Sequence, residues 1–236
     1  MKYIKLFIIY FTFNALANAQ QTELEVVTEH WPPYIIQGAE VTGIVTEKIN
    51  QILKPTDINY AIHVYPWARS FHLATTKPNV LIYSIYRNEQ REPYFHWFCP
   101  IHDSTPIYVF KLAHNDKNID SIEALKSSVI GIMRGDNSHN FFKKYGFKEQ
   151  VNLDVSADED ANLLKLVNGK IDAVVQSRDA IEYRLKKLGM KGIKIKSGLA
   201  IHQGDHAQHC MALSKGTDQQ LVDKVQAAFD RWLLTK

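Results

Sequence analysis

The chain has 236 residues, 45% of them hydrophobic, and a formal net charge of only +3. Its lysines and arginines form no continuous run, which argues against nucleic acid as a partner. After the N-terminal region no segment approaches the ~20 apolar residues of a membrane-spanning helix, so we expect no direct membrane insertion of the mature chain.

The N-terminus has the pattern of a secretory signal peptide over residues 1–19. Lys2 and Lys5 form a positive region, residues 6–13 are apolar, and residues 17–19, Ala-Asn-Ala, form a small-x-small cleavage site. Cleavage there removes two of the 28 basic residues and none of the 25 acidic ones, which leaves a net charge of about +1. We therefore expect a mature protein that is secreted to the periplasm.

The first segments of the mature chain alternate between strand and helix patterns. Residues 24–28 alternate as a short strand, and Gly43 precedes an amphipathic helix. Residues 59–65 form a second strand pattern, after which Pro66 fits the first position of another helix. The apolar run at 80–84 is typical of a strand buried on both faces. This order predicts an α/β unit with a mainly parallel sheet.

A second unit of the same kind follows along the chain. Its expected elements are a strand at 107–112, a helix at 121–126, a strand at 129–133, a helix capped by Asn137 or Ser138, a helix opened by Asp158, a strand at 171–175, a strand at 210–213 and a closing helix from Asp218. No internal repeat and no low-complexity linker separates the two units. We expect two lobes joined by short crossings.

Several short motifs are spread over nearly the whole mature chain. They are Trp-Pro-Pro-Tyr at 31–34, Gly43 before a helix, Pro-Trp at 66–67, Ser84 with Arg91, Phe-x-Pro at 98–100, Gly-Ile-x-x-Gly at 131–135 and Gly-x-x-Asp-Ala at 169–173. In order and spacing they resemble the extracellular solute-binding proteins of family 3, which serve polar amino-acid ABC transporters. The segments Pro-Trp-Ala-Arg and Arg-x-x-x-Arg-Glu are similar to a divergent, short branch of that family.

The resemblance implies the type II periplasmic-binding-protein fold: two α/β lobes with mixed, mainly parallel sheets joined by two hinge strands. Transferred to this chain, lobe 1 covers residues 22–104 plus 198–236, and lobe 2 covers residues 105–197. Cys99 and Cys210 then both fall in lobe 1 near the crossings, which favours a disulfide bond. Two buried free thiols are the alternative.

The resemblance also implies a ligand site in the cleft between the lobes. On lobe 1, Arg91 matches the arginine that binds a ligand carboxylate, and Ser84 and Tyr86 match contact positions beside it. Trp31 and Trp67 match aromatic walls. The alternatives are a surface arginine paired with a neighbouring glutamate and tryptophans that only pack within the lobe.

On lobe 2, Asp136 and Asn137 match the turn that contacts the ligand, although an aspartate repels a carboxylate unless an arginine offsets it. Amino-acid binders carry an acid five residues beyond the equivalent of Asp172, where it binds the α-ammonium group. Here that position is Ser177, with Asp179 as the nearest acid. A buried ammonium without an acidic partner is costly, so Ser177 argues against a standard α-amino acid as the ligand.

The resemblance implies a monomeric, non-enzymatic protein without a cofactor. It captures a small polar, carboxylate-bearing, amino-acid-like ligand by hinge closure and delivers it to an ABC permease of the inner membrane. The alternatives are a sensor subunit for a membrane receptor and an enzyme similar to the cyclohexadienyl dehydratases, with Asp136 or Asp179 as general acid. His202, His206, His209 and Cys210 raise the further alternative of a zinc site, against a solvated polar loop.

Overall fold

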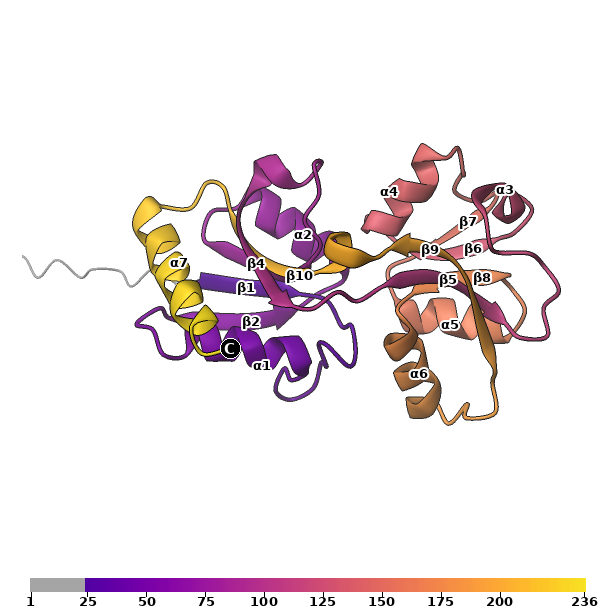
Figure 1. The fold of residues 1–236 in the computed structure, drawn as a ribbon, viewed down its shortest axis with the longest axis horizontal. Coiled ribbons are helices and arrows are strands. Elements are labelled where there is room, and N and C mark those ends of the chain that lie inside the picture. Colours follow the sequence, from indigo (N-terminus) through magenta and orange to yellow (C-terminus); the bar gives the residue numbers. More distant parts are fainter. Residues whose placement is uncertain (1–23) are drawn as a thin grey trace, which may run out of the picture.

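The computed structural model describes residues 24–236, so the predicted signal peptide lies outside the described residues. Figure 1 shows an elongated molecule with two lobes of similar build that lie side by side. The first lobe contains both the N-terminal part of the described chain and the C-terminal helix, and the second contains the middle. The chain therefore passes between the lobes twice.

The first lobe is built on a five-stranded sheet in the order β2-β1-β3-β10-β4. Its elements are β1 (Leu24–Thr28), α1 (Ile44–Leu53), β2 (Tyr60–Val64), α2 (Trp67–Thr76), β3 (Val80–Ile85), the 3-10 turn η1 (Glu92–Tyr94), β4 (Phe95–His102), β10 (His209–Ser214) and α7 (Gln219–Leu233). Helices α1 and α7 pack on each other on one side of the sheet, and α2 lies on the other side (Figure 1).

The second lobe repeats this plan with the strand order β7-β6-β8-β5-β9. Its elements are β5 (Ile107–Leu112), α3 (Ile122–Leu125), β6 (Ile130–Met133), α4 (Asn137–Lys144), β7 (Leu153–Ser156), α5 (Glu159–Val167), β8 (Ala173–Gln176), α6 (Arg178–Lys187), β9 (Ile195–His202) and the 3-10 turn η2 (Gly204–Ala207). The prediction of two α/β lobes with mixed sheets is confirmed.

Parallel pairing does not dominate the sheets, in contrast to the expectation. In the first sheet β1 pairs in parallel with β2 and β3, whereas β10 is antiparallel to both β3 and β4. The second sheet has the same balance, since β5 is antiparallel to β8 and β9. The antiparallel strands are those next to the crossings. Antiparallel neighbours need no helix between them, so the chain can enter each sheet directly from a crossing.

The return crossing lies later in the chain than the predicted boundary between residues 197 and 198. Strand β9 pairs with β5 along its whole length, from Ile195 opposite Leu112 to His202 opposite Ile107. Residues 198–202 therefore belong to the second sheet, and the boundary was placed too early. The chain returns to the first lobe through η2 and enters β10 at His209.

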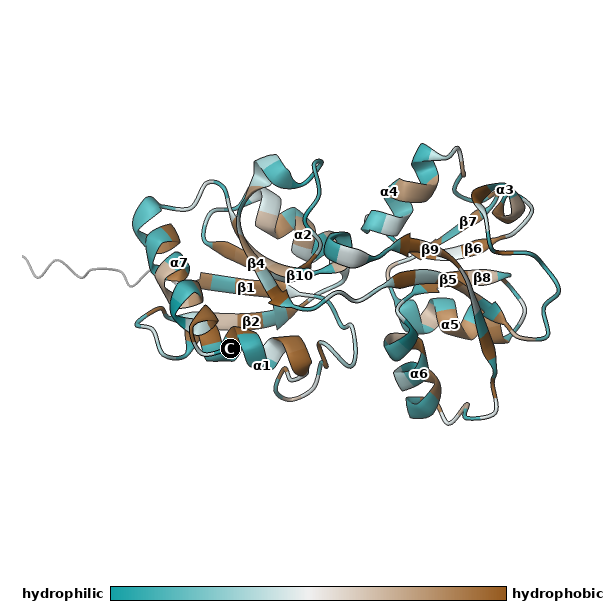
Figure 2. Cartoon of the chain, viewed as in Figure 1, coloured by the Kyte–Doolittle hydropathy of each residue, from teal (hydrophilic) through white to brown (hydrophobic). Residues whose placement is uncertain are grey.

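The hydrophobic core follows the sheets. Every residue of β3 and of β10 is buried, because these strands are central and covered on both faces. Figure 2 shows apolar residues concentrated on the strands and polar residues on the outward faces of α6 and α7. In α7 the buried side chains Leu221, Val225, Phe229 and Trp232 follow helical spacing, which explains how this helix covers the sheet.

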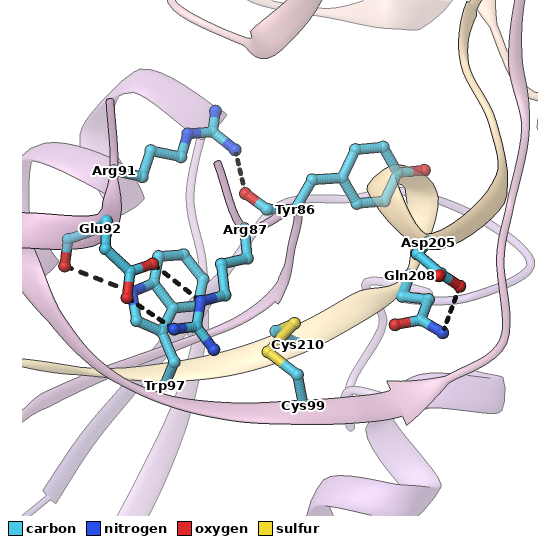
Figure 3. The surroundings of a disulfide bond; sticks show 9 residues. All are labelled: Tyr86, Arg87, Arg91, Glu92, Trp97, Cys99, Asp205, Gln208 and Cys210. Atoms are coloured by element: carbon cyan, nitrogen blue, oxygen red, sulfur yellow. Dashed lines mark hydrogen bonds and ion pairs between the residues drawn. A yellow bond between two sulfur atoms is a disulfide. The ribbon is translucent and has the colours of Figure 1, made fainter. Parts of the chain in front are cut away.

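A disulfide bond joins Cys99 of β4 to Cys210 of β10. These strands are neighbours in the sheet, and Figure 3 shows the bond between them, close to the segment that carries Tyr86 and Arg91. Of the two alternatives left open by the sequence, the structure has the bonded one. The bond connects residues 111 positions apart and so fixes the C-terminal segment to the first part of the chain.

Gly43 provides a sharp stability test, because a side chain at this position meets the backbone. Its φ is +116°, and a Cβ atom there lies 2.5 Å from the carbonyl oxygen of Tyr34. Gly189 has a φ of +73° but nothing within 4 Å of an added Cβ, so it is a matched control. We expect Gly43→Ala to lower the free energy of unfolding by about 1–3 kcal/mol more than Gly189→Ala, measured by urea denaturation. Equal losses would contradict the steric argument.

Candidate ligand-binding cleft

A cavity lies between the two lobes, and side chains from both of them line it. The space between its walls is about 550 Å³, and part of this space is open to solvent. The lining residues are Glu29, His30, Trp31, Trp67, Ser84, Tyr86, Arg91, Ile107, Met133, Asp136, Asn137, Ser138, Glu159, Val175, Gln176 and His202.

Hydrogen bonds across the cleft hold the lobes together. They are Trp31 Nε1 to Gln176 Oε1 at 2.8 Å, Trp67 Nε1 to the Gly135 carbonyl at 2.9 Å, Asn88 Nδ2 to Asn137 Oδ1 at 2.7 Å, Tyr34 OH to Asp179 Oδ2 at 3.0 Å and Arg184 Nη2 to the His30 carbonyl at 3.1 Å. Each bond joins a residue of one lobe to a residue of the other. The structure is therefore a closed arrangement, and opening the cleft must break these contacts.

Arg91 faces the cavity from the loop after β3, as predicted, but its guanidinium group is already engaged. It is 6% exposed, Nη1 donates to the Tyr86 carbonyl at 3.0 Å, and the group lies 5.0 Å from the centre of the Trp67 ring. Burial lowers its pKa to about 10, so it remains charged at neutral pH. The surface ion pair with Glu92 belongs instead to Arg87 (Figure 3).

Ser84 and Tyr86 both line the cavity and also support the crossing between the lobes. Ser84 has a φ of +63°, a strained conformation for a residue other than glycine, and its Oγ lies 2.6 Å from Nδ1 of His209. The other ring nitrogen of His209 lies 2.8 Å from Oγ1 of Thr105, whose carbonyl accepts a bond from Tyr86 OH. A hydrogen-bonded chain therefore links the cavity to the first crossing.

Trp31 and Trp67 form aromatic walls of the cavity, and each also reaches across the cleft. Trp31 stacks on His209 with 4.9 Å between ring centres and an angle of 6°. Trp67 packs on Phe71, and the Arg91 guanidinium contacts both rings. Because both indole nitrogens donate to the second lobe, these side chains combine the two roles that the sequence left as alternatives: packing within the lobe and facing the ligand site.

Asp136 and Asn137 line the cavity from the second lobe, at the N-terminus of α4. Asp136, rather than Asn137 or Ser138, caps the helix, since its Oδ1 accepts a bond of 2.6 Å from the His139 amide. Burial raises the pKa of Asp136 to about 6, and hydrogen bonds and the nearby Arg91 partly offset this rise. Asn137 accepts the cross-lobe bond from Asn88.

Ser177 does not line the cavity, in contrast to the prediction. It is the N-cap of α6, where its Oγ accepts a bond from the Ala180 amide and its own amide donates to Gln176 Oε1. The preceding residue, Gln176, faces the cavity in its place. Asp179 is also outside the lining and bonds Tyr34. The expected position of an ammonium-binding acid is thus occupied by a helix cap.

Two acidic residues that sequence reasoning missed face the cavity: Glu29 from the end of β1 and Glu159 from the first turn of α5. Burial in the cleft raises the pKa of each to about 8, and for Glu29 the carboxylates of Glu159 and Asp136 raise it further. A signal for Glu29 existed in the sequence, because it directly follows a strand, where open sheets place ligands. Glu159 follows the helix cap Asp158 and resembles an ordinary first-turn acid.

The histidine-rich segment does not form the zinc site that was the alternative to a solvated polar loop, since no group of three or more possible metal ligands occurs among residues 24–236. Cys210 is bonded to Cys99, and His209 is held between Ser84 and Thr105. His202 instead lines the cavity, where burial and the nearby Arg91 lower its pKa to about 4 and keep the ring neutral.

The chain has the two-lobed fold that is seen in periplasmic binding proteins. Over 92% of both chains, the structure is similar to a histidine kinase sensor domain with similarity to periplasmic binding proteins (TM-score 0.77, 15% identity). It is also similar to an ancestral arginine-binding protein bound to arginine (TM-score 0.74, 19% identity, 89% of this chain and 91% of that one). A third similar structure is the substrate-binding protein of an amino acid ABC transporter (TM-score 0.71, 18% identity, 91% and 94%).

At the level of sequence, no family model matches the chain and no curated protein matches it. The likeness is therefore one of fold. Within residues 24–236, none of the helices has the length and apolar character needed to cross a membrane.

Proposed function

We propose that this protein is a periplasmic solute-binding receptor that captures a small polar ligand by closing its two lobes. The observation that carries the proposal is the cavity lined by both lobes, whose walls are joined by hydrogen bonds that exist only when the cleft is shut. Ligand contacts made only in the closed state shift the equilibrium from open to closed. No step in this mechanism makes or breaks a covalent bond, so the proposed role is non-enzymatic.

The order of events follows from the side chains of each lobe. The ligand docks first on the wall formed by Trp31, Ser84 and Arg91. The second lobe then closes over it with Asp136 and Asn137, and Gln176 completes its bond to Trp31. The hinge is the pair of crossings near Thr105 and His209, which is the usual geometry of two-lobe closure.

The partner that recognises the closed form is an ABC permease in this proposal, with the protein acting as a monomer in the periplasm. The predicted signal peptide and the similarity to an amino acid ABC transporter component support this assignment. The histidine kinase sensor domain among the similar structures supports a second candidate, a sensor that signals through a membrane receptor. Co-purification with the permease or with a receptor distinguishes them.

The test of ligand capture is a thermal-shift screen of the mature protein against amino acids, organic acids and polyamines. We expect one chemical group to raise the midpoint of unfolding and to change tryptophan fluorescence, because Trp31 and Trp67 lie in the closing interface. A ligand that is converted during incubation would contradict the non-enzymatic role. Stabilisation by no member of the screen would contradict ligand capture.

The Trp31 bond gives a quantitative prediction for closure. Trp31→Phe keeps an aromatic ring on His209 but removes the donor to Gln176, so we expect the bound ligand to dissociate about 5–10 times faster with little change in association. Stopped-flow fluorescence measures both rates through the remaining tryptophans. Trp97→Phe is the matched control, because Trp97 donates to Glu92 within the first lobe. Equal dissociation rates for the two variants would contradict a closing role for Trp31.

A further inference from the structure

The charged side chains that line the cavity are unbalanced. Three are acidic, Glu29, Asp136 and Glu159, and one is basic, Arg91. The two lining histidines, His30 and His202, both have lowered pKa values and add no positive charge at neutral pH. Arg184 lies close enough to act on Glu29 and Glu159, but it forms an ion pair with Asp160, so that pair is neutral as a unit. Fully ionised, the lining carries two negative charges in excess.

The two glutamates have almost no partners of their own. Among residues 24–236, no hydrogen bond or ion pair reaches the carboxylate of Glu29, and Glu159 receives only a long bond of 3.4 Å from Asn162. Glu159 is only 7% exposed, and Glu29 is half-buried. A buried carboxylate without a cationic partner is costly, so the closed cleft is incomplete without positive charge from outside.

The lobes contribute these acids separately, Glu29 from the first and Glu159 and Asp136 from the second. Closing the cleft therefore brings like charges together. The carboxylates of Glu159 and Asp136 both raise the pKa of Glu29. A cation placed between them removes this repulsion in the closed state only. The cation thus has the differential affinity for the two states that a closing ligand needs.

The remaining walls favour a cation and disfavour an anion. The rings of Trp31, Trp67 and Tyr86 line the cavity, and aromatic faces attract ammonium groups. Arg91, the group expected to bind a carboxylate, donates to the Tyr86 carbonyl and acts on both Asp136 and Glu29. Arg134, two residues before Asp136 in the chain, is exposed and lines a different surface pocket. A ligand carboxylate therefore meets a single, already engaged arginine beside acidic neighbours.

We propose that the cleft binds a small aliphatic amine with two positive charges and no carboxylate, its ammonium groups held by Glu29 and Glu159. This inference rests on the proposed solute-binding role and names its substrate class. Two charges balance the excess of the lining, whereas a zwitterionic amino acid leaves that excess unchanged. The ligand is thus the element that permits closure, because it supplies the missing partner of a carboxylate on each lobe.

The test compares three probes that share one carbon skeleton: 1,5-diaminopentane, lysine, which adds a carboxylate to it, and norleucine, which keeps the carboxylate and lacks the side-chain amine. Isothermal titration calorimetry at pH 8 measures each affinity. We expect the diamine to bind at least about tenfold more tightly than lysine, and norleucine to show no binding. Lysine binding as tightly as the diamine, or norleucine binding at all, would overturn the inference and still support the solute-binding role. If none of the three compounds binds, the inference about the diamine is overturned. The proposed solute-binding role is not, because the thermal-shift screen against other ligands tests it separately.

Variants assign the charge to the two glutamates. Glu29→Gln and Glu159→Gln are each expected to weaken diamine binding about 10- to 100-fold, since each removes a charged partner but keeps the shape of the side chain. Glu182→Gln is the matched control, because Glu182 is an exposed acid of α6 that pairs with Arg178. Thermal unfolding confirms that each variant is folded. Unchanged diamine affinity in both cleft variants would overturn the assignment.

A second readout needs no ligand. Because the glutamates repel each other only when the cleft is closed, neutralising either one shifts the free protein towards the closed form. At pH 9, where both glutamates of the closed form are ionised, we expect Glu29→Gln and Glu159→Gln to have a smaller radius of gyration by small-angle X-ray scattering than the unmodified protein without ligand, and Glu182→Gln to match the unmodified protein. Identical values for all four proteins would contradict the closing role of the charge.

Discussion

Replacing Cys99 and Cys210 together with alanine is expected to lower the free energy of unfolding by about 4 kcal/mol. The disulfide closes a loop of 111 residues, and a cross-link of this length removes much of the entropy of the unfolded chain. It also fixes β10, a central strand that arrives from the second crossing, to the edge strand β4. Urea denaturation at pH 7 measures the loss.

Reduction of the unmodified protein provides the control for this prediction. A reductant should lower its stability to the level of the double variant and leave the double variant unchanged, because only the cross-link differs. The cysteines lie outside the lining of the cavity, so ligand affinity should persist wherever the variant is folded. A double variant as stable as the unmodified protein would show that pairing of β10 with β3 and β4 alone holds the C-terminal segment.

The elements that could be predicted from the sequence are those whose signal is local. Strand β3 is an apolar run that is buried throughout, and Ser121, Asp158 and Asp218 each cap the helix that their position indicated. These features depend on one segment and its immediate neighbours. For this reason the order of strands and helices, and with it the two-lobed class, followed from pattern together with family resemblance.

The elements that were missed have weak local signals. Helix α6 has a mostly polar sequence, and only a few positions such as Ile181 and Leu185 face inward. Strand β4 has no regular alternation of polar and apolar residues, and it contains Pro100, which disfavours a strand unless the strand lies at a sheet edge, where β4 is found. In both cases the tertiary environment decides the structure.

The residues of the cleft also divide into those that the sequence indicates and those that it does not. Transfer of family positions placed Trp31, Trp67 and Arg91 at the cavity, because the first lobe carries them on the loop after β1, at the start of α2 and on the loop after β3. It failed for Ser177, where a short polar residue serves as a helix cap. Glu29 and Glu159 could not be singled out, since their burial depends on the approach of the opposite lobe, which neither segment encodes alone.

These buried acids lead to the second large prediction, a fall in the stability of the ligand-free protein between pH 6.5 and 8. The pKa of Glu29 and of Glu159 is raised to about 8 in the folded protein, so the folded state holds protons that the unfolded state has already lost. Raised carboxyl pKa values make stability decrease as pH rises towards the folded-state pKa. We expect the free energy of unfolding to fall by roughly 1–3 kcal/mol over this interval. Urea denaturation at several pH values measures this loss.

Below pH 6.5, other buried groups change the stability of the protein in the opposite direction. The pKa values of His202 and His209 are lowered by burial, so these side chains contribute stability that is present above pH 6.5 and lost as pH falls. Asp136, with a pKa of about 6, completes most of its titration before the interval ends. Between pH 6.5 and 8 the glutamates therefore dominate, and Glu159→Gln should flatten the profile while Glu182→Gln leaves it unchanged.

Binding of the diamine should have the opposite pH dependence to the stability of the free protein. Two ammonium groups beside Glu29 and Glu159 favour the ionised carboxylates, so binding releases protons below pH 8 and tightens as pH rises through the same interval. Calorimetry in buffers of different ionisation enthalpy measures the number of protons released. Because loss of stability in the free protein and gain of affinity in the complex arise from the same two carboxyl groups, Glu159→Gln must diminish both. A variant that flattens the stability profile but leaves the pH dependence of binding intact would separate the titrating groups from the ligand site.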